Sequence, residues 1–457
     1  MNWHFPALAH AAAFPNARAV SVDGDARTWR ELLDRSARLQ TIWEERLPKG
    51  ARLLLPAERS LCFLEHFVAL LRAGQHVVLV SPDATEEERA HAREVADVTH
   101  EVTVEELHRL AEQGPSQNAA SHAEPWKPER ALLSVLTSGT TGKPKAITLH
   151  AEQVIFSSLG SAARLGALPS DRWHAPLPLH HVGGIMVLLR ALIFGFEAEY
   201  TSSFDIDQSA QRLASGEVTL ASFVPVMLER ILEKHPELQG PQTLRAILLG
   251  GAACPPKLLE RAAQAQLPVA RSWGMSETAS QIATASPGNL DSPLAPLPFA
   301  HVFEREGRLV IEGPQAMHGL YISSDRGQVS AQGVHIHGRA DDVFISGGEN
   351  VDPVEIEAVL LRHDNVEAAL VIGAPSARWG QKAVAFVVAP KLDDQQLRQH
   401  CEAALEKFKI PKSFYFVDDI PRNSMGKPSR NVALAEWQER YAAADADTSC
   451  SDSGANA

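Results

Sequence analysis

The segment from Thr137 to Lys145 combines hydroxyl groups, glycines and lysines, and it directly follows the apolar run Ala131 to Leu136. Glycines let backbone N–H groups approach anionic oxygens, while hydroxyl and ammonium groups add donors and positive charge. A strand that runs into such a loop indicates a site for the phosphates of a nucleotide. The residues expected to contact those phosphates are Thr137, Ser138, Gly139, Thr140, Thr141, Gly142 and Lys145.

The spacing in this loop differs from that of a Walker loop. A Walker loop has four residues between its first glycine and a Gly-Lys pair, which Ser or Thr then follows. Here two residues separate Gly139 from Gly142, and Lys143 is followed by proline. An ordinary turn of glycine and threonine between two strands is the alternative. The complete set of hydroxyls, glycines and lysines favours a phosphate loop of another kind.

Taken with other segments, this loop resembles the phosphate loop of the adenylate-forming superfamily, which contains acyl-CoA synthetases, peptide-synthetase adenylation domains and luciferases. Further segments resemble the other motifs of that superfamily and follow one another in its order. They are Leu248 to Ala253, Ser272 to Thr278, Gly338 to Asp342 and Pro421 to Lys427. The resemblance extends over almost the whole chain and implies a two-step reaction, in which a carboxylate attacks the α-phosphate of ATP and a thiol then attacks the acyl-adenylate.

The resemblance implies catalytic roles for two charged residues. Lys427 resembles the lysine that bridges the carboxylate and the α-phosphate, where a preorganised positive charge stabilises the transition state; a basic surface loop is the alternative. Glu277 matches the glutamate that helps to hold Mg²⁺, with Thr141 as a second candidate ligand, since a hard cation prefers oxygen and keeps several waters. Alternatively, Glu277 is an acidic residue at a helix N-terminus behind an N-cap Ser276.

The same resemblance assigns residues to the nucleoside. Trp273 stands where the superfamily often has a tyrosine that stacks on adenine, and Asp325 resembles the aspartate that binds the ribose hydroxyls, with Arg339 as its partner. The context of Asp325 is Ser-Ser-Asp, where many relatives have Thr-Gly-Asp. The expected nucleoside-binding residues are Gly250, Gly251, Ala252, Trp273, Gly274, Ser276, Asp325 and Arg339.

A second domain is expected after Gly338, where the superfamily has a small lid that rotates between the two half-reactions. Asp341 matches the hinge residue, although a solvated turn is the alternative. Gly347 and Gly348 resemble the loop that lines the pantetheine tunnel of coenzyme A. The expected division is an ATP- and acyl-binding domain over 1–338, a hinge at 339–341, a lid over 342–440 and a disordered tail over 441–457, which has little to bury.

The acyl group is expected near His181, which resembles a histidine that gates the acyl pocket; a structural histidine is the alternative. Further pocket candidates are Ser222, Ser280 and Gln281. Segments around Ser280, at Arg378 to Gln381 and at Phe408 to Phe416 look similar to o-succinylbenzoate:CoA ligases of menaquinone biosynthesis. The alternatives are another aryl- or medium-chain acyl-CoA ligase, an adenylation enzyme that loads a carrier protein, and a non-catalytic nucleotide-binding regulator.

Alternating strand and helix patterns must position these residues. A helix with the capping box Thr28 and Glu31 precedes the strand Arg52 to Leu55, and the helix Phe63 to Arg72 precedes the strand His76 to Val80. Such alternation predicts an α/β fold with a large N-terminal domain of mostly parallel sheets covered by helices. The resemblance adds a small mobile C-terminal α+β lid.

The composition agrees with a large enzyme that acts on small molecules. The 457 residues exceed what one core usually holds, and the net charge of −13 argues against nucleic acid as a partner. The four cysteines have no metal or disulfide spacing, and no apolar run suggests membrane insertion. We therefore expect a cytoplasmic protein, and the resemblance implies that it uses a small-molecule carboxylic acid, ATP, Mg²⁺ and coenzyme A. The sequence leaves its oligomeric state open, a homo-oligomer included.

Overall fold

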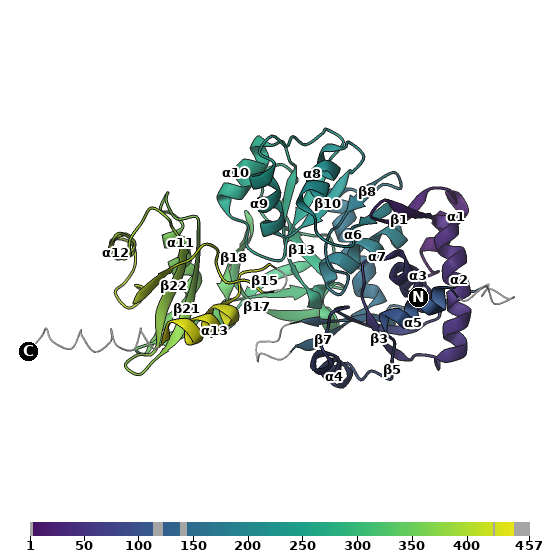
Figure 1. Ribbon diagram of the computed structural model, residues 1–457, viewed down its shortest axis with the longest axis horizontal. Helices are drawn as coiled ribbons and strands as arrows, with labels where there is room; N and C mark the ends of the chain where they lie inside the picture. The colour runs from purple at the N-terminus through teal and green to yellow at the C-terminus, as the bar shows by residue number, and fades with distance from the viewer. Residues whose placement is uncertain (1–2, 113–121, 138–143, 424–425, 443–457) are drawn as a thin grey trace, which may run out of the picture. The chain divides into compact units, whose positions relative to one another are not determined.

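The computed structural model describes residues 3–112, 122–137, 144–423 and 426–442 (Figure 1). The chain divides into two compact units. The first contains Met1–Phe303, Val310–Ile322 and Val329–Val334. The second contains Glu304–Leu309, Ser323–Gln328 and His335–Ala457. Most of the tail predicted to be disordered lies outside the described residues.

An N-terminal sheet of the first unit has the strand order β5-β3-β4-β6-β7 within the described residues. The strands from β5 to β6 are parallel, and β7 pairs with β6 in the antiparallel direction. Leu53 and Leu55 face the core that α3 and α5 complete, whereas Leu54 faces α4, because successive side chains of a strand point to opposite faces. The elements are β3 (Arg52–Pro56), α3 (Leu61–Arg72), β4 (His76–Val80), α4 (Glu86–Val95), β5 (His100–Glu101), α5 (Val104–Glu112), β6 (Ala131–Thr137) and β7 (Lys145–His150).

A second, larger sheet of this unit has the order β14-β13-β12-β11-β10-β8-β9-β1-β2 within the described residues. Its central strands are parallel, and antiparallel pairs stand at both edges. The strands are β1 (Arg18–Val22), β2 (Asp25–Thr28), β8 (Arg172–His174), β9 (Glu197–Tyr200), β10 (Leu220–Phe223), β11 (Ala246–Leu249), β12 (Val269–Met275), β13 (Ser280–Thr284) and β14 (Ala295–Pro296).

Helices cover both faces of the larger sheet. On β11, Ala246 and Leu248 belong to the core that contains α6 and α7, and Ile247 and Leu249 belong to the core built with α8, α9 and α10. Figure 1 shows α8, α9 and α10 gathered beside β10. The helices are α1 (Ala7–Ala13), α2 (Trp29–Arg46), α6 (Ala151–Leu165), α7 (Val182–Phe194), α8 (Ile206–Ala214), α9 (Pro225–Lys234) and α10 (Pro256–Gln264).

The local signals predicted from the sequence form as expected at the start of the chain. Thr28 caps α2 by accepting from the amide of Glu31 at 3.2 Å, and the Glu31 carboxylate accepts from the amide of Thr28 at 2.8 Å. Gly74 follows α3 with a φ of +77°.

Helices within the described part of the chain are too short or too polar to cross a bilayer.

A sheet of strand order β15-β16-β17-β18 follows in the sequence, and its residues are divided between the two units. Its strands are β15 (His301–Arg305), β16 (Arg308–Glu312), β17 (Leu320–Ser330) and β18 (Gly333–Arg339), with the turn η2 (Met317–Gly319) before β17.

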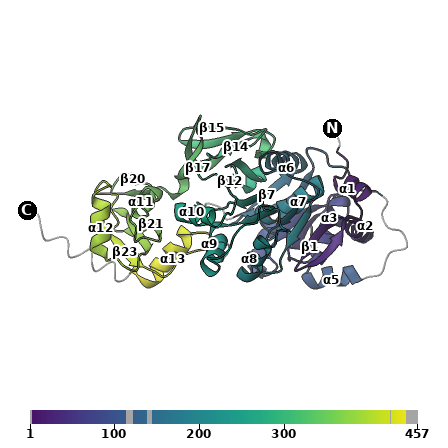
Figure 2. The ribbon, with the colours of Figure 1, turned by 90° about the horizontal axis from the view of Figure 1, so that it is seen from above.

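The second unit contains a sheet of order β20-β19-β22-β21, with β23 paired to β22. The residues Val371 and Ala385 face α11 and α12, and Ile372 and Phe386 face α13, so helices cover both faces (Figure 2). The elements are η3 (Ala340–Asp342), β19 (Phe344–Ser346), β20 (Glu349–Val351), α11 (Pro353–Leu360), β21 (Ala368–Ser376), β22 (Gly380–Val388), α12 (Asp394–Glu402), β23 (Ser413–Phe416) and α13 (Arg430–Arg440). The predicted fold class is confirmed.

Candidate active site

A tight turn joins β12 to β13 through the short 3₁₀ helix η1 (Ser276–Thr278). Gly274 makes this turn feasible, because a Cβ atom there would lie 1.7 Å from the carbonyl oxygen of Ser280. Ala279 and Ser280 have φ angles of +50° and +95°, which residues with side chains seldom adopt. Such backbone strain persists only where the surrounding structure holds it in place.

Buried side chains of α6 hold this turn. Ser157 Oγ donates to the carbonyl of Ala279 at 2.6 Å, and Gln153 Nε2 donates to the carbonyl of Glu277 at 3.2 Å. Within the turn, the hydroxyl of Thr278 accepts from the amide of Met275 at 3.3 Å. Gln153 and Ser157 were not among the site residues predicted from the sequence. The available signal was their spacing of four residues, which places two polar groups on one face of a largely apolar helix.

The carboxylate of Glu277 is the charged group that this turn positions. Its Oε1 atom lies 2.8 Å from Lys145 Nζ and accepts from the Tyr321 hydroxyl at 2.9 Å. Burial raises the pKa of Glu277, but bonds from Lys145, the residue's own amide and Tyr321 outweigh burial and bring the pKa below its ordinary value. Glu277 is therefore ionised near neutral pH and 7% exposed. Tyr321 was not predicted as a site residue.

The ion pair joins this turn to the end of the predicted phosphate loop. Lys145 begins β7 and pairs with Thr137, the last residue of β6. Ser138, Gly139, Thr140, Thr141 and Gly142 lie outside the described residues. The ammonium of Lys145 is half exposed, so an incoming anion can reach it. The described ends of the loop thus place a cation and an ionised carboxylate side by side.

The alternative interpretation, in which Ser276 is the N-cap of a helix, is wrong. Ser276 does not cap an α-helix, because η1 is only three residues long and Met275 precedes it. The chain turns back instead and pairs β13 with β12. Trp273 lies in β12 and is 6% exposed, so little of its indole is open to an adenine ring. Gly250, Gly251 and Ala252 follow β11, the neighbour of β12 in the sheet.

The predicted acyl-pocket residues differ in their surroundings. His181 is half-buried at the N-cap of α7, and its ring centroid lies 4.1 Å from that of His180. Burial, followed by the charge of Arg59, lowers the pKa of His180 to about 4. His180 is therefore neutral near pH 7.

Ser222 and Gln281 already have partners inside the protein. Ser222 is 3% exposed, and its hydroxyl accepts from the indole of Trp173 at 2.8 Å. Gln281 is 1% exposed and donates to the hydroxyl of Thr284 at 3.0 Å. Ser280, by contrast, is half-buried in the strained turn beside Glu277. Ser280 and His181 are therefore the more accessible of the four candidates.

The second unit contains the predicted ribose pair. Arg339 Nη1 lies 3.7 Å from Asp325 Oδ1, and Arg339 Nη2 lies 3.4 Å from Asp341 Oδ2. The amide of Asp325 donates to the hydroxyl of Ser323 at 3.1 Å, which fixes the backbone next to this carboxylate. The structure thus brings Asp325, Arg339 and the predicted hinge residue Asp341 together around one guanidinium group.

Lys427 belongs to a loop that Asn423 closes on itself. The side-chain oxygen of Asn423 accepts from the backbone N–H of Lys427 at 3.0 Å, and the backbone N–H of Asn423 donates to the carbonyl of Lys427 at 2.9 Å. Arg422 Nη1 also donates to the carbonyl of Gly426 at 3.2 Å. The Lys427 ammonium forms no ion pair with a carboxylate of the described residues, and burial alone lowers its pKa. The loop therefore holds a half-buried cation that lacks a counter-charge within this part of the chain.

The turn at Gly347 and Gly348 joins β19 to β20. A Cβ atom at Gly347 would lie 2.9 Å from the ring of Trp379, and the amide of Gly347 donates to the Trp379 carbonyl at 2.8 Å. The guanidinium of Arg378 lies 4.7 Å from the centre of that ring, and the Lys412 ammonium lies 5.8 Å from it. A partly exposed indole with two cations therefore adjoins the predicted coenzyme A loop.

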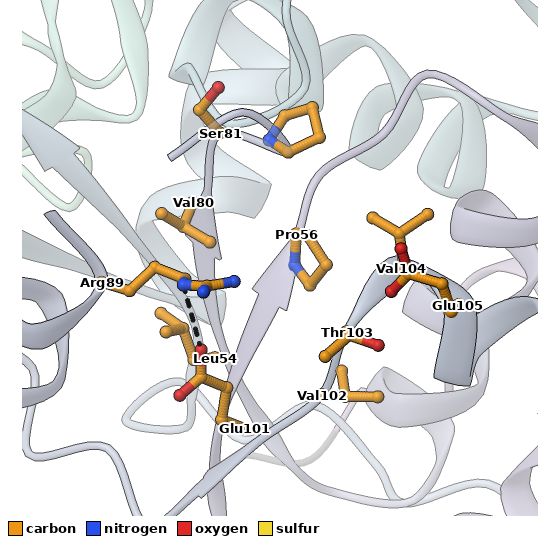
Figure 3. Close-up of a pocket in the computed structure, with 11 residues that line it drawn as sticks. Leu54, Pro56, Val80, Ser81, Arg89, Glu101, Val102, Thr103, Val104 and Glu105 are labelled. Carbon is orange, nitrogen blue, oxygen red and sulfur yellow. Dashed lines mark ion pairs between the residues drawn. The ribbon is translucent and has the colours of Figure 1, made fainter. Parts of the chain in front are cut away.

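A cavity of about 310 Å³ lies at the carboxyl ends of β3 and β4 (Figure 3). The guanidinium of Arg89 faces Glu101 there, with Nε 3.6 Å from Oε1. None of the predicted site residues that the structure describes lines it. The lining residues are Leu54, Pro56, Val80, Ser81, Pro82, Arg89, Glu101, Val102, Thr103, Val104 and Glu105.

Segments of both units match known protein families. The sequence profile of the AMP-binding enzyme family matches residues 8–321, and the profile of the AMP-binding enzyme C-terminal domain matches residues 355–427. A 2-succinylbenzoate–CoA ligase from Geobacillus sp. (strain WCH70) is 37% identical over 329 residues, which make up 65% of this chain and 67% of the relative.

Solved structures of o-succinylbenzoate coenzyme A synthetase from Bacillus subtilis are similar over nearly the full length. The complex with its acyl-adenylate intermediate has a TM-score of 0.84 at 28% identity, and the match covers 94% of this chain and 98% of the other. The complex with ATP and a magnesium ion has a TM-score of 0.83 at 28% identity, with coverage of 95% and 100%.

Proposed function

Since this chain belongs to the AMP-binding enzyme family, we propose that it is an ATP-dependent acid:CoA ligase whose substrate is o-succinylbenzoate. The observation that carries the proposal is the contact between Lys145 and Glu277, which joins the end of the phosphate loop to an ionised carboxylate in the first unit. A cation can bind phosphate oxygens, and an ionised carboxylate can bind the Mg²⁺ that accompanies ATP. Both co-substrates, ATP and coenzyme A, are kept in the cytoplasm, and we propose that the enzyme works there.

In the first step, a carboxylate oxygen of the acid attacks the α-phosphorus of ATP and pyrophosphate leaves, which gives an acyl-adenylate. Negative charge builds up on the α-phosphate oxygens in the transition state. Lys427 supplies a positive charge that no carboxylate of the described residues neutralises in advance, so its attraction is available to that charge. Preorganised groups of this kind usually make the largest contribution to catalysis.

The residues present fit a magnesium ion that is held mainly by the nucleotide. Mg²⁺ prefers oxygen ligands and commonly takes one or two carboxylates together with phosphate oxygens and water. Glu277 offers an ionised carboxylate and would hold the ion, while Lys145 would pass from Glu277 to the phosphates. Bound Mg²⁺ would neutralise charge on the leaving pyrophosphate. Among the described residues, no cluster of three or more His, Cys, Asp or Glu side chains is arranged to hold a metal without the nucleotide.

In the second step, the thiol of coenzyme A loses its proton to solvent, its sulfur attacks the acyl carbon, and AMP leaves. An ordinary thiol with a pKa of about 8.5 is only slightly ionised at neutral pH, so the activation of the acyl group by AMP carries most of this step. Gly348 has open space beside its backbone and would admit the pantetheine arm, while Gly347 lets the indole of Trp379 pack close to the turn. That indole with its two cations suits the adenine and phosphates of coenzyme A. Asp341 is the proposed hinge.

Support for o-succinylbenzoate comes from the relatives, which act on this acid or bind its adenylate. His181 and Ser280 are the accessible candidates for the acyl pocket. Another aryl- or medium-chain acid is the runner-up, since the same two steps activate any carboxylic acid that the pocket accepts. Loading of a carrier protein in place of coenzyme A is the third alternative.

The test is product formation with ATP, Mg²⁺ and coenzyme A, analysed by mass spectrometry for o-succinylbenzoate, benzoate and octanoate in parallel. We expect o-succinylbenzoyl-CoA as the dominant product, together with AMP and pyrophosphate. Thioesters of benzoate or octanoate in its place would retain the mechanism and refute the substrate. Adenylate without thioester in the presence of coenzyme A would favour a carrier protein as the acceptor.

A further inference from the structure

Arg430 connects the two predicted working parts of the second unit. It is the first residue of α13 and follows Lys427 by three positions. Its Nη2 lies 2.9 Å from Glu357 Oε1, and its Nε lies 3.6 Å from Asp342 Oδ2. Asp342 directly follows the proposed hinge residue Asp341. All three side chains are largely buried, with side-chain exposures of 20% for Arg430, 14% for Glu357 and 26% for Asp342.

The two contacts of Arg430 differ in kind. The contact to Glu357 has hydrogen-bond length, and Glu357 is itself anchored because it accepts from the amide of Val371 at 2.8 Å. The contact to Asp342 is too long for a hydrogen bond, and Arg430 Nε is buried without a hydrogen-bond partner in the described part of the chain. A buried donor that lacks its bond costs free energy. A small movement at Asp342 would therefore make a bond that is absent here.

Arg430 is connected to the Lys427 loop through its neighbour Ser429, so a movement of Arg430 would displace that loop. Ser429, its neighbour, donates from its amide to the carbonyl of Pro421 at 3.0 Å and so closes the base of that loop. The hydroxyl of Ser429 also accepts from the amide of Val432 at 3.4 Å and caps α13. The loop, the cap of α13 and the hinge are thus linked through residues 429 and 430.

We propose that Arg430 is a positioning residue of the lid. It keeps Asp342, next to the hinge residue, in a fixed position relative to the loop that carries Lys427. The proposal rests on the proposed function, since the hinge and the role of Lys427 belong to it. Glu357 is the fixed partner of Arg430, and Asp342 is the partner whose distance changes as the hinge turns. Forming or releasing the Asp342 contact would bias the lid toward one of the two half-reactions.

The test compares Asp342→Asn, Asp342→Glu and Arg430→Lys with the wild type in the full-length chain. Adenylation is followed by exchange of labelled pyrophosphate into ATP, and thioester formation by single turnover of adenylate made beforehand. We expect Asp342→Asn to change the ratio of the two rates by about tenfold, within the range reported for coupling residues. Asp342→Glu keeps the charge and should retain most of the wild-type ratio, and Arg430→Lys should fall between the two.

Asp394→Asn is the matched control, because Asp394 is an exposed carboxylate that pairs with Arg398 within α12 at 3.5 Å. It should leave both rates and their ratio unchanged. Hydrogen exchange at the amides of 340–343 provides a readout independent of activity, and Asp342→Asn should accelerate it while Asp394→Asn does not.

The proposal is overturned if Asp342→Asn leaves both the ratio and the exchange at 340–343 unchanged. It is also overturned if the variant slows both half-reactions equally, because such a loss indicates a structural role only. Failure of the proposed function is distinct: the wild type itself would then give no pyrophosphate exchange with any acid. In that case the exchange at 340–343 still decides whether Arg430 holds the hinge segment.

Discussion

The carboxylate of Glu277 and the ammonium of Lys427 stand in contrasting surroundings. Glu277 lies in a strained turn that α6 holds with buried hydrogen bonds, and its charge is already matched by Lys145 at 2.8 Å. Lys427 lies in a loop that Asn423 holds through two hydrogen bonds to Lys427, and no carboxylate of the described residues matches its charge. The turn at Glu277 has its charges balanced before ATP binds, whereas the Lys427 loop has a cation that is not paired with a carboxylate of the described residues.

This difference has a physical reason in the proposed reaction. Glu277 and Lys145 are proposed to bind Mg²⁺ and the phosphates in the ground state, and their ion pair keeps both charges compensated before the nucleotide binds. A group that acts on the transition state contributes most when its charge is unpaired until negative charge develops. The contrast predicts that the two regions respond differently to substitution.

The largest effect is expected for Lys427→Ala, which removes the unbalanced cation. Adenylation should fall by about 10²- to 10³-fold, the range found when one transition-state donor is deleted. The measurement is pyrophosphate exchange at saturating ATP and acid. Lys409→Ala is the control, because Lys409 pairs with Glu355 at 2.9 Å and Glu406 at 3.0 Å and should be dispensable. A Lys427→Ala enzyme with a nearly normal rate would remove one side of the comparison.

Glu277→Gln should reduce adenylation by about 10²-fold, because it removes the ionised ligand proposed for Mg²⁺ and leaves Lys145 unbalanced. Unlike the loss at Lys427, this one should recover partly as Mg²⁺ is raised, which a magnesium titration of the exchange rate would measure. Tyr321→Phe removes one hydrogen bond to the same carboxylate. It should raise the Mg²⁺ concentration at half-maximal exchange rate by about tenfold. An unaltered magnesium dependence in Glu277→Gln would refute the metal role.

The pH dependence of stability tests the charges of the second unit. Desolvation by burial raises the pKa of Glu357 from 4.5 to about 7, and the charge of Asp342 on η3 adds to this rise. Arg430 on α13 and the amide of Val371 lower the pKa, but burial outweighs them. Between those two values the folded state holds a proton that the unfolded state has lost. Stability should therefore fall as pH rises from about 4.5 to about 7, by roughly 3 kcal/mol at most, and then level off.

Hydrogen exchange of the β21 amides at several pH values, corrected for intrinsic rates, measures this slope. Glu357→Gln cannot ionise and should lack it, whereas Asp394→Asn should retain it. A wild-type slope of the opposite sign would mean that Arg430 holds Glu357 ionised and that desolvation is the weaker influence.

Ser157→Ala should destabilise the first unit by about 1–3 kcal/mol, because the buried carbonyl of Ala279 loses its donor. Ser158→Ala is matched to it, since Ser158 is equally buried but donates to Val154 in its own helix at 2.6 Å. Denaturant unfolding should show a clearly smaller loss for Ser158→Ala. Equal losses would mean that the strained turn does not depend on α6, contrary to the comparison.

Local sequence patterns predicted much of the fold because short-range physics sets them. The capping box of Thr28 and Glu31, the strand His76 to Val80 and the helix that ends at Arg72 lie where the sequence indicates. The same reasoning was wrong for Ser276, because a serine followed by an acidic residue has the pattern of a helix start. The antiparallel pairing of β13 with β12 overrides that pattern, and a local window cannot contain it.

The types and order of the chemical groups were determined by the sequence alone: the proposed phosphate loop, Glu277, Asp325, the proposed hinge and Lys427. Only the tertiary structure decided what holds and balances them. Ser157 and Ala279 are 122 residues apart, Tyr321 and Glu277 are 44 apart, and Lys145 on β7 contacts Glu277 in η1. Such contacts form because packed sheets bring distant segments together, and neither periodicity nor spacing within one segment encodes which residues will meet.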